Sequence, residues 1–142
     1  MRTFDLSRQE RSSVLEGIAK ELAGRKEILF AYAHGSFLGE GPFRDLDLAV
    51  YLYPEMTPDR PFHYEDDLAA SLARQLKLAF PVDVRILNGA PVSFRYHVFQ
   101  GRLLCETDSA ARIDIVVHTL ARYFDFAPFL GHYLKDAYGC ET

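Results

Sequence analysis

The sequence predicts an α/β or α+β domain in which a small mixed sheet is flanked by helices. Helical and strand patterns follow one another in the order α-β-β-α-β-α-β-α, and no repeat, low-complexity tract or linker interrupts them. The 142 residues are 49% hydrophobic and 25% charged, which is the size and composition of one globular domain. We therefore expect a single domain over residues 1–142.

The first half of the chain shows the patterns of one helix and two strands. A capping box opens the helix, a short apolar run indicates a buried strand, and alternating apolar and polar residues indicate the second strand. A glycine-rich connection joins the two strands, and a helical turn at residues 36–39 would open it. The expected ranges are 7–24 for the helix, 28–33 and 46–53 for the strands, and 35–41 for the connection.

The second half of the chain predicts two further strands and three helices. The core stripe of the next helix is Leu68, Leu72, Leu76 and Ala79, and Pro81 should end that helix. Alternation then indicates a third strand. A short helix, a short edge strand and a long final helix complete the chain, and Pro128 should kink or break the last of these. The expected ranges are 82–87 for the strand, 91–101 for the short helix, 103–106 for the edge strand and 109–138 for a C-terminal helical segment.

Charge and cysteine content exclude several classes of protein. Twenty acidic against sixteen basic residues give a net charge of −4, which argues against a broad nucleic-acid-binding face. Cys105 and Cys140 have no zinc or redox spacing and are expected to be free thiols. No apolar run reaches the ~20 residues that span a bilayer, and the N-terminus lacks a signal-peptide pattern. We therefore expect a cytoplasmic protein that does not bind membranes.

Asp45 and Asp47 are the first candidates for chemistry. On a strand, side chains two residues apart point to the same face, so the two carboxylates can converge on a metal ion, while Leu46 and Leu48 face the core. Two such carboxylates repel each other unless a cation lies between them. Magnesium takes oxygen ligands of this kind and commonly keeps substrate phosphates in its shell.

Asp83 is the third candidate because it lies within an otherwise apolar strand. If that strand pairs near the strand of Asp47, the three carboxylates can hold two divalent ions for an in-line phosphoryl displacement. Asp83 could then accept the proton of the attacking hydroxyl. The alternative is an ion pair of Asp83 with Arg85 or Arg95.

Gly35 and Ser36 directly follow a buried strand and suggest a phosphate site. Glycine lets the backbone approach an anion closely, and the N–H groups of a following helical turn would point at phosphate oxygens. Ser36 could also be a simple helix N-cap, a role compatible with phosphate binding. The pattern is neither a Walker A loop nor GxGxxG. His34 lies beside this site and is expected to pack or to form a hydrogen bond there.

Gly-Ser, a loop, Asp-x-Asp on a strand and a later lone Asp on a strand resemble the nucleotidyltransferase superfamily that includes DNA polymerase β. The small size and the element order resemble its minimal nucleotidyltransferases, the MNT domains. Two tail segments, Asn88 to Gly101 and Arg122 to Asp125, are similar to MntA-type proteins. The resemblance covers nearly the whole chain, and its sharp part is the five positions Gly35, Ser36, Asp45, Asp47 and Asp83.

The resemblance implies a polymerase β-like fold, triphosphate binding by Gly35 and Ser36, and metal binding by Asp45, Asp47 and Asp83. It also implies Mg²⁺ and a nucleoside triphosphate, most often ATP. MntA-type proteins are antitoxins that transfer AMP from ATP to a tyrosine of a HEPN-domain ribonuclease toxin. This chain departs from the pattern in a shorter connection between Ser36 and Asp45 and in Arg44, which replaces a polar serine.

Three functions follow from these observations. The leading hypothesis is a metal-dependent protein adenylyltransferase that acts as an antitoxin on a HEPN toxin. The second is an antitoxin that neutralises the toxin by binding alone through its final helix, which the shorter connection favours. The third is a small-molecule nucleotidyltransferase of the aminoglycoside type, although the chain has little room for the further helical domain that such enzymes usually carry.

Overall fold

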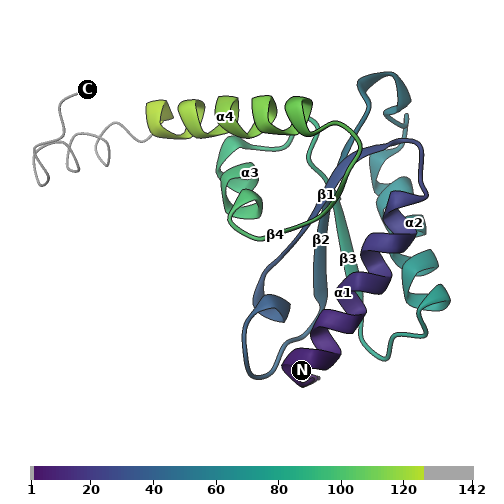
Figure 1. Cartoon of the computed structure of the whole chain (residues 1–142). Coiled ribbons are helices and arrows are strands. Elements are labelled where there is room, and N and C mark those ends of the chain that lie inside the picture. Colours follow the sequence, from purple (N-terminus) through teal and green to yellow (C-terminus); the bar gives the residue numbers. More distant parts are fainter. Residues whose placement is uncertain (1, 127–142) are drawn as a thin grey trace, which may run out of the picture.

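The computed structural model describes residues 2–126, which form four α-helices, two 3₁₀ turns and one four-stranded sheet (Figure 1). In chain order the elements are α1 (Arg8–Ala23), β1 (Ile28–His34), η1 (Ser36–Leu38), β2 (Leu46–Leu52), η2 (Pro54–Met56), α2 (Pro61–Gln75), β3 (Val82–Ile86), α3 (Val92–Phe99), β4 (Arg102–Glu106) and α4 (Ser109–Phe126). The predicted order of helices and strands and the predicted fold class are both confirmed.

The sheet has the strand order β3-β2-β1-β4, with β4 at one edge as predicted. β1 runs antiparallel to both β2 and β4, whereas β2 and β3 are parallel, so the sheet is mixed. In this register His34 lies opposite Asp47, and Asp47 lies opposite Asp83. The condition under which Asp83 could join the other carboxylates, pairing of the third strand with the second, is therefore met.

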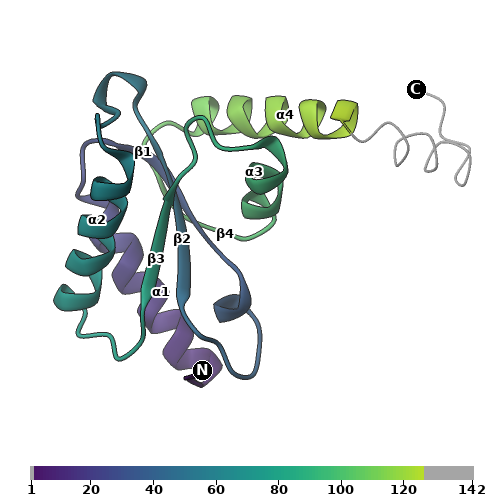
Figure 2. The same cartoon turned by 180° about the vertical axis from the view of Figure 1, so that it is seen from behind.

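Helices cover both faces of the sheet, and each face has its own hydrophobic cluster. α1 and α2 pack on one face and α3 packs on the other, while α4 projects from one end of the molecule (Figures 1 and 2). Leu46, Leu48 and Val50 of β2 point toward α1 and α2 and are fully buried. Because side chains alternate along a strand, Asp47 and Ala49 point to the opposite face. The carboxylates therefore lie on the α3 side.

The first helix begins and ends where its sequence signals indicate. Ser7 accepts a hydrogen bond from the backbone N–H of Glu10, and the Glu10 carboxylate accepts one from the N–H of Ser7. This reciprocal capping box satisfies two N–H groups that have no partner within the helix. Gly24 is the C-cap. Both features were predicted.

The second helix ends earlier than the sequence predicted. The core stripe placed Leu76 and Ala79 in a helix that Pro81 would stop, but α2 ends at Gln75. Lys77 adopts the left-handed conformation with a φ of 51°, and the N–H of Leu78 donates to the carbonyl of Ala73. This is a Schellman motif, which terminates a helix through the backbone and normally has glycine at the left-handed position. With lysine there, the sequence carries no stop signal.

The tail of the described chain follows the prediction up to Phe126. Pro91 is the N-cap of α3 rather than its first residue, and α3 ends before Gly101. α4 begins at Ser109, the first residue of the predicted segment 109–138, and the part of that segment beyond Phe126, with Pro128, lies outside the described residues. Among the helices described, none combines the length and apolar character needed to cross a membrane.

Candidate active site

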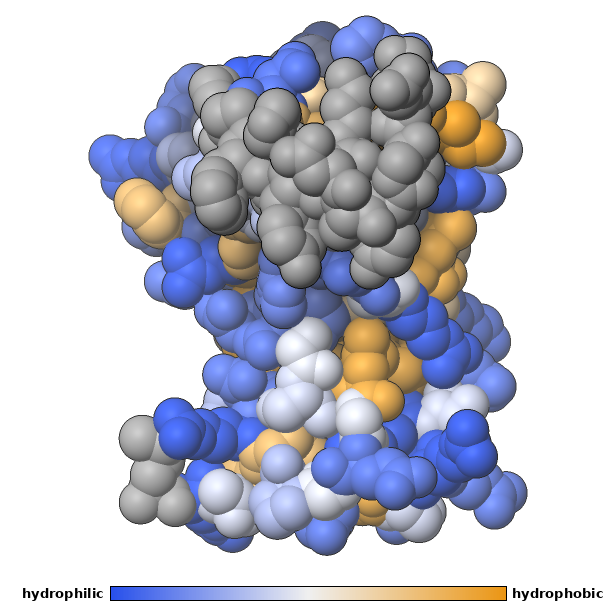
Figure 3. Space-filling view, turned by 90° about the vertical axis from the view of Figure 1, so that its left-hand side faces the viewer, coloured by the Kyte–Doolittle hydropathy of each residue, from blue (hydrophilic) through white to orange (hydrophobic). Residues whose placement is uncertain are grey.

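Three strands bring a row of polar residues together on the α3 face of the sheet. His34 at the end of β1, Asp47 near the start of β2 and Asp83 near the start of β3 are neighbours in the strand pairing. Paired residues on adjacent strands point to the same face and have backbones about 5 Å apart. Seen from the side on which α4 projects, the outline of the molecule narrows at mid-height, where many of the visible residues are hydrophilic (Figure 3).

Gly35 turns the chain from β1 into η1 and brings the backbone against Asp47. Its φ of 86° and ψ of −165° belong to a region that only glycine adopts without strain. A Cβ atom at this position would lie 2.5 Å from the Oδ2 atom of Asp47. Glycine is thus required here both by the conformation and by the close approach. The helical turn predicted at residues 36–39 is present as η1, Ser36–Leu38.

An open cleft of about 570 Å³ contains three of the five predicted site residues, Ser36, Asp45 and Asp47. The residues that line the cleft are Thr3, Ser36, Pro42, Phe43, Arg44, Asp45 and Asp47. Gly35 adjoins this cleft through its contact with Asp47. Ser36 is exposed, so its hydroxyl is available to a ligand in the cleft. The glycine–serine turn and the Asp-x-Asp pair therefore face one common space.

Burial and neighbouring carboxylates raise the pKa of Asp47 to about 7. The largest cause is desolvation, followed by the charge of Asp45 and a side-chain hydrogen bond with it, then by the charge of Asp83. Arg85 opposes these effects. Two carboxylates at this spacing repel each other when both are ionised. A divalent cation would relieve the repulsion and keep both groups ionised.

Asp83 makes a different contact in this structure. Its Oδ2 atom lies 3.4 Å from the Nε atom of Arg85, which is two residues along the same face of β3. The ion pair that was the alternative role for Asp83 is therefore present. Within residues 2–126 no three His, Cys, Asp or Glu side chains are gathered closely enough to hold a metal ion jointly. The Asp45–Asp47 pair by itself has the oxygen donors that Mg²⁺ prefers, so the donor set fits this ion.

His34 is a buried group beside these carboxylates. Its side chain packs edge-on against the rings of Phe94 and His97 of α3, with centroids 5.6 and 5.3 Å away. Desolvation, followed by the nearby His97, lowers the pKa of His34 to about 4, so the ring is neutral at pH 7. Neither ring nitrogen has a hydrogen-bond partner among the described residues. Packing, one of the two roles expected for His34, is the one observed.

One residue that contacts the connection between Ser36 and Asp45 was not predicted. Arg11 of α1 is only 5% exposed, and its guanidinium donates to the carbonyls of Phe37 and Gly39. A signal was present in the sequence, because Arg11 falls on the same helical face as Leu15, Ile18 and Leu22. An arginine on an apolar helical face needs a partner inside the protein.

Comparison with known families decides what kind of domain this is. The family model described as polymerase beta, nucleotidyltransferase matches residues 16–110, which is more than half of the chain. The chain belongs to the polymerase β nucleotidyltransferase family. The matched range includes Gly35, Ser36, Asp45, Asp47 and Asp83.

Several solved structures similar in fold to this nucleotidyltransferase are of toxin–antitoxin complexes. One is of a tri-AMPylated Shewanella oneidensis HEPN toxin in complex with an MNT antitoxin. It is 19% identical, has a TM-score of 0.61, and the match covers 89% of this chain and 98% of the other. A toxin–antitoxin structure with AMP-PNP is 21% identical, with a TM-score of 0.63 and coverage of 87% and 97%. The MntA-HepT complex is 17% identical, with a TM-score of 0.57 and coverage of 92% and 98%.

These similarities establish the fold of the nucleotidyltransferase domain over most of its length. Sequence identities of 17–21% are too low to show more than a common fold. No curated protein sequence matches the chain.

Proposed function

We propose that this nucleotidyltransferase is an antitoxin that transfers AMP from ATP to a tyrosine hydroxyl of a cognate HEPN-family ribonuclease toxin. One observation carries the proposal: in a domain of this family, Ser36 and the Asp45–Asp47 pair line one cleft, and Gly35 lies against it. The cleft thus has a turn suited to phosphate beside carboxylates suited to a cation. The solved complexes of similar fold, which contain a HEPN toxin or AMP-PNP, support the partner and the nucleotide.

The proposed reaction is an in-line displacement at the α-phosphorus of ATP. The tyrosine oxygen forms a bond to the α-phosphorus, the bond from that phosphorus to the oxygen of the β-phosphate breaks, and pyrophosphate leaves. We assign the triphosphate to Gly35 and Ser36 and the proton of the tyrosine hydroxyl to the Asp83 carboxylate. Asp45, Asp47 and Asp83 would hold two Mg²⁺ ions, which when bound neutralise phosphate charge and lower the pKa of the attacking hydroxyl.

The proposal requires Asp83 to leave Arg85, and this exchange costs little. The side chains of Asp83 and Arg85 are 42% and 53% exposed. Ion pairs between such exposed groups contribute about 0–1 kcal/mol. Asp83 is already the strand neighbour of Asp47, so the proposal requires its side chain to turn toward the pair and leaves the strand in place. Addition of an AMP group would place negative charge on the toxin and oppose its binding to RNA.

Neutralisation by binding alone is the second candidate. Two observations favour it: the ion pair of Asp83 with Arg85, and the connection between Ser36 and Asp45, which is shorter than in MntA-type proteins. In that case the carboxylates would be dispensable. The variant Asp45→Asn with Asp47→Asn would still protect cells from the toxin.

The test is the intact mass of the protein encoded by the adjacent gene after incubation with this chain, Mg²⁺ and each nucleoside triphosphate. We expect a nucleotide-sized gain with the wild type and with Asp59→Asn, a control at an exposed aspartate of the loop after η2. The gain should be absent with Asp47→Asn.

Three other results are possible in this experiment, and each leads to a different conclusion. A gain that survives in Asp47→Asn would contradict the metal role of Asp47. A stable complex without any gain would favour neutralisation by binding, and the absence of a complex would favour a small-molecule acceptor.

A further inference from the structure

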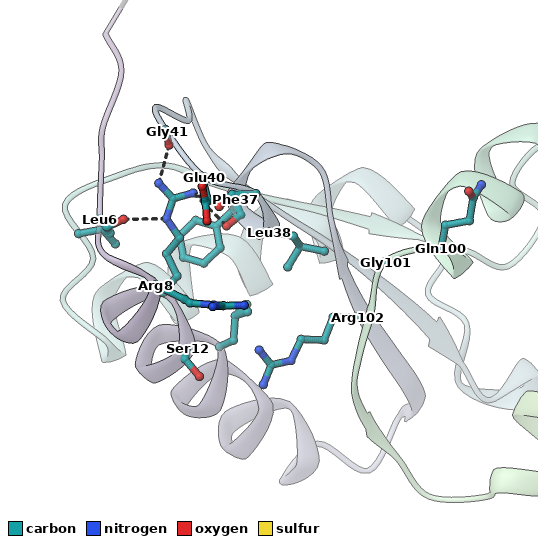
Figure 4. Close-up of a pocket in the computed structure, with 13 residues that line it drawn as sticks. Leu6, Arg8, Ser12, Phe37, Leu38, Glu40, Gly41, Gln100, Gly101 and Arg102 are labelled. Carbon is teal, nitrogen blue, oxygen red and sulfur yellow. Dashed lines mark hydrogen bonds between the residues drawn. The ribbon is translucent and has the colours of Figure 1, made fainter.

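Arg11 is a buried arginine whose five N–H groups all have acceptors. Its Nε atom donates to the carbonyl of Leu6 at 2.9 Å, and Nη1 donates to the carbonyls of Phe37 at 3.2 Å and Gly39 at 2.8 Å. Nη2 donates to the carboxylate of Asp5 at 2.9 Å and to the carbonyl of Gly41. Five is the whole donor capacity of a guanidinium. Figure 4 shows the carbonyls of Leu6 and Gly41 joined by dashed lines to this group.

Three of these acceptors belong to the connection between Ser36 and Asp45. Backbone hydrogen bonds hold both ends of the connection. The N–H of Gly39 donates to the carbonyl of Ser36 at 3.0 Å, and Phe43 and Phe4 each donate one hydrogen bond to the carbonyl of the other. Between those ends, Arg11 binds the carbonyls of Gly39 and Gly41, so the middle of the connection is fixed by one side chain.

Residues of the connection line two separate hollows. One is the cleft with Ser36, Asp45 and Asp47. The other is a cavity of about 600 Å³, which residues Phe37 to Gly41 border and whose remaining lining comes mostly from α1 and from the start of β4 (Figure 4). Phe37 and Phe43 of the connection are buried in the core, whereas Gly39 and Glu40 between them are exposed and have no such packing. Arg11 borders the same cavity and binds the carbonyls of Gly39 and Gly41, so it holds the stretch that the core does not.

The aromatic residues around Arg11 fix the position of the guanidinium. Its central carbon lies 5.7 Å from the ring centroid of Phe37 and 5.0 Å from that of Phe43, and these two rings contact each other edge to face at 4.8 Å. A cation over aromatic faces in a buried site is favourable and directional. Lysine has three donors and no planar group, so it cannot make the five bonds or the stacking contacts.

We infer that Arg11 is a positioning residue for nucleotide binding. It holds the connection so that the Gly35–Ser36 turn faces the cleft in the shape that accepts the triphosphate before the nucleotide arrives. This inference rests on the proposed function, because it assigns Arg11 a role in the triphosphate site of that reaction. Arg11 itself touches no reacting atom. Its effect is confined to the phosphate end of the ligand.

The experiment measures binding of Mg²⁺–AMP-PNP and of adenosine to the wild type, Arg11→Lys and Arg25→Lys. Arg25 is a matched control, since it is partly exposed and bonds to Ser71, away from the connection. We expect Arg11→Lys to weaken AMP-PNP binding at least tenfold and to leave adenosine binding unchanged. Arg25→Lys should leave both unchanged. In the transfer assay, KM for ATP should rise more than kcat falls.

Two results would overturn the inference while leaving the proposed function in place. One is equal AMP-PNP binding by the wild type and a folded Arg11→Lys. The other is an equal loss for AMP-PNP and adenosine, which would indicate a general structural role. If the wild type itself binds no AMP-PNP, the proposed function fails, and that outcome is distinct from both.

A measurement on the wild type covers the case in which Arg11→Lys does not fold. If Arg11 holds the connection in advance, the peptide 36–43 should exchange its amide hydrogens more slowly than the loop 53–60 in the nucleotide-free protein. Addition of AMP-PNP should then slow that exchange only slightly. Exchange of the two peptides at the same rate, followed by strong protection by the nucleotide, would overturn the inference.

Discussion

At the scale of single residues, the cleft contains groups that reduce the stability of the fold. Asp47 is a half-buried carboxylate next to another carboxylate, and Gly35 lies against it in a backbone conformation that only glycine adopts without strain. Features of this kind are common where a ligand binds, because they prepare the site at the expense of the free protein. Substitutions at Asp47 and Gly35 test how these features affect the free energy of unfolding.

Asp47→Asn should stabilise the metal-free protein at high pH. Because the pKa of Asp47 is raised to about 7 in the folded state, the folded protein binds a proton more tightly than the unfolded chain. Stability therefore falls as pH rises from about 4 to about 7, and asparagine removes this loss. The full pKa shift of Asp47 would correspond to a stability difference of about 4 kcal/mol. Because the group is half exposed, solvent screening reduces the expected difference between Asp47→Asn and the wild type to ~1–2 kcal/mol.

Urea denaturation in EDTA checks this prediction at pH 8 and pH 5. The advantage of Asp47→Asn should be largest at pH 8 and shrink at pH 5, and Asp59→Asn should show no such trend. An advantage that does not depend on pH would contradict the raised pKa. Excess Mg²⁺ should stabilise the wild type more than Asp47→Asn, since only the wild type retains both carboxylates.

Gly35→Ala should destabilise the fold more than Gly41→Ala does. Both glycines have left-handed φ values, 86° and 85°, so both substitutions add backbone strain. A Cβ atom at Gly41 meets open space, whereas at Gly35 it meets Asp47 at 2.5 Å. We expect a loss of about 1 kcal/mol at Gly41 and of at least about 2–3 kcal/mol at Gly35. Equal losses in the free energy of unfolding would mean that the contact with Asp47 is unimportant.

At the scale of elements, short-range signals and backbone geometry agree in α1 but conflict in α2. Ser7 and Glu10 cap α1 with side chains that the sequence displays. α2 ends by a Schellman motif with Lys77 at the left-handed position, where a Cβ atom is unfavourable. The apolar pattern continues past this point because Leu76 and Leu78 still pack against the core. A pattern of burial therefore extends beyond the end of the helix.

Lys77→Gly should stabilise the protein by about 0.5–1 kcal/mol, because glycine adopts the left-handed conformation without steric cost. Thermal or urea unfolding measures the change. Lys77→Ala is the control: it removes the same long side chain but keeps the Cβ atom, so it should bring no such gain. If the two variants have equal stability, the left-handed strain is not the cause.

At the scale of the whole molecule, α4 packs mainly on α3. Ala111 and Ile115 near its start pack against the α3-side cluster, and Tyr123 near its end stacks on Tyr96 of α3, with the rings 3.9 Å apart and 3° from parallel. Beyond the sheet the helix projects outward (Figure 2). Its last described turns therefore rely on a few contacts with α3 and can open locally.

Tyr123→Ala should loosen the end of α4 while leaving the rest of the fold in place. Loss of a stacked aromatic pair, worth about 0.5–1.5 kcal/mol, should speed amide exchange at residues 119–126 about three- to tenfold. Hydrogen exchange measured by mass spectrometry would detect this, with the β1 peptide as the internal reference. Phe62→Ala, at a side chain that is 75% exposed on α2, should change neither region. An unchanged α4 would mean that other contacts hold its end.

Much of the site could be predicted because its residues lie close together in sequence. Asp45 and Asp47 share a face through strand alternation, and Gly35 and Ser36 follow a buried strand directly. Asp83 could be assigned only under the condition that its strand pairs with β2, and the parallel register meets that condition. The ion pair of Asp83 with Arg85 and the contacts of the His34 ring with Phe94 and His97 depend on side-chain packing, so the sequence left them open.

The sequence by itself determined the order of helices and strands, the capped start of α1 and the division of β2 into a core face and a polar face. These features depend on residues a few positions apart in the chain, so they can be recognised in the sequence itself. Only the tertiary structure decided the strand order, the end of α2 and the contacts of Arg11. The bonds of Arg11 to the connection span 26 to 30 residues. Contacts of that range exist only after the sheet has formed, because folding brings together groups that no local pattern relates.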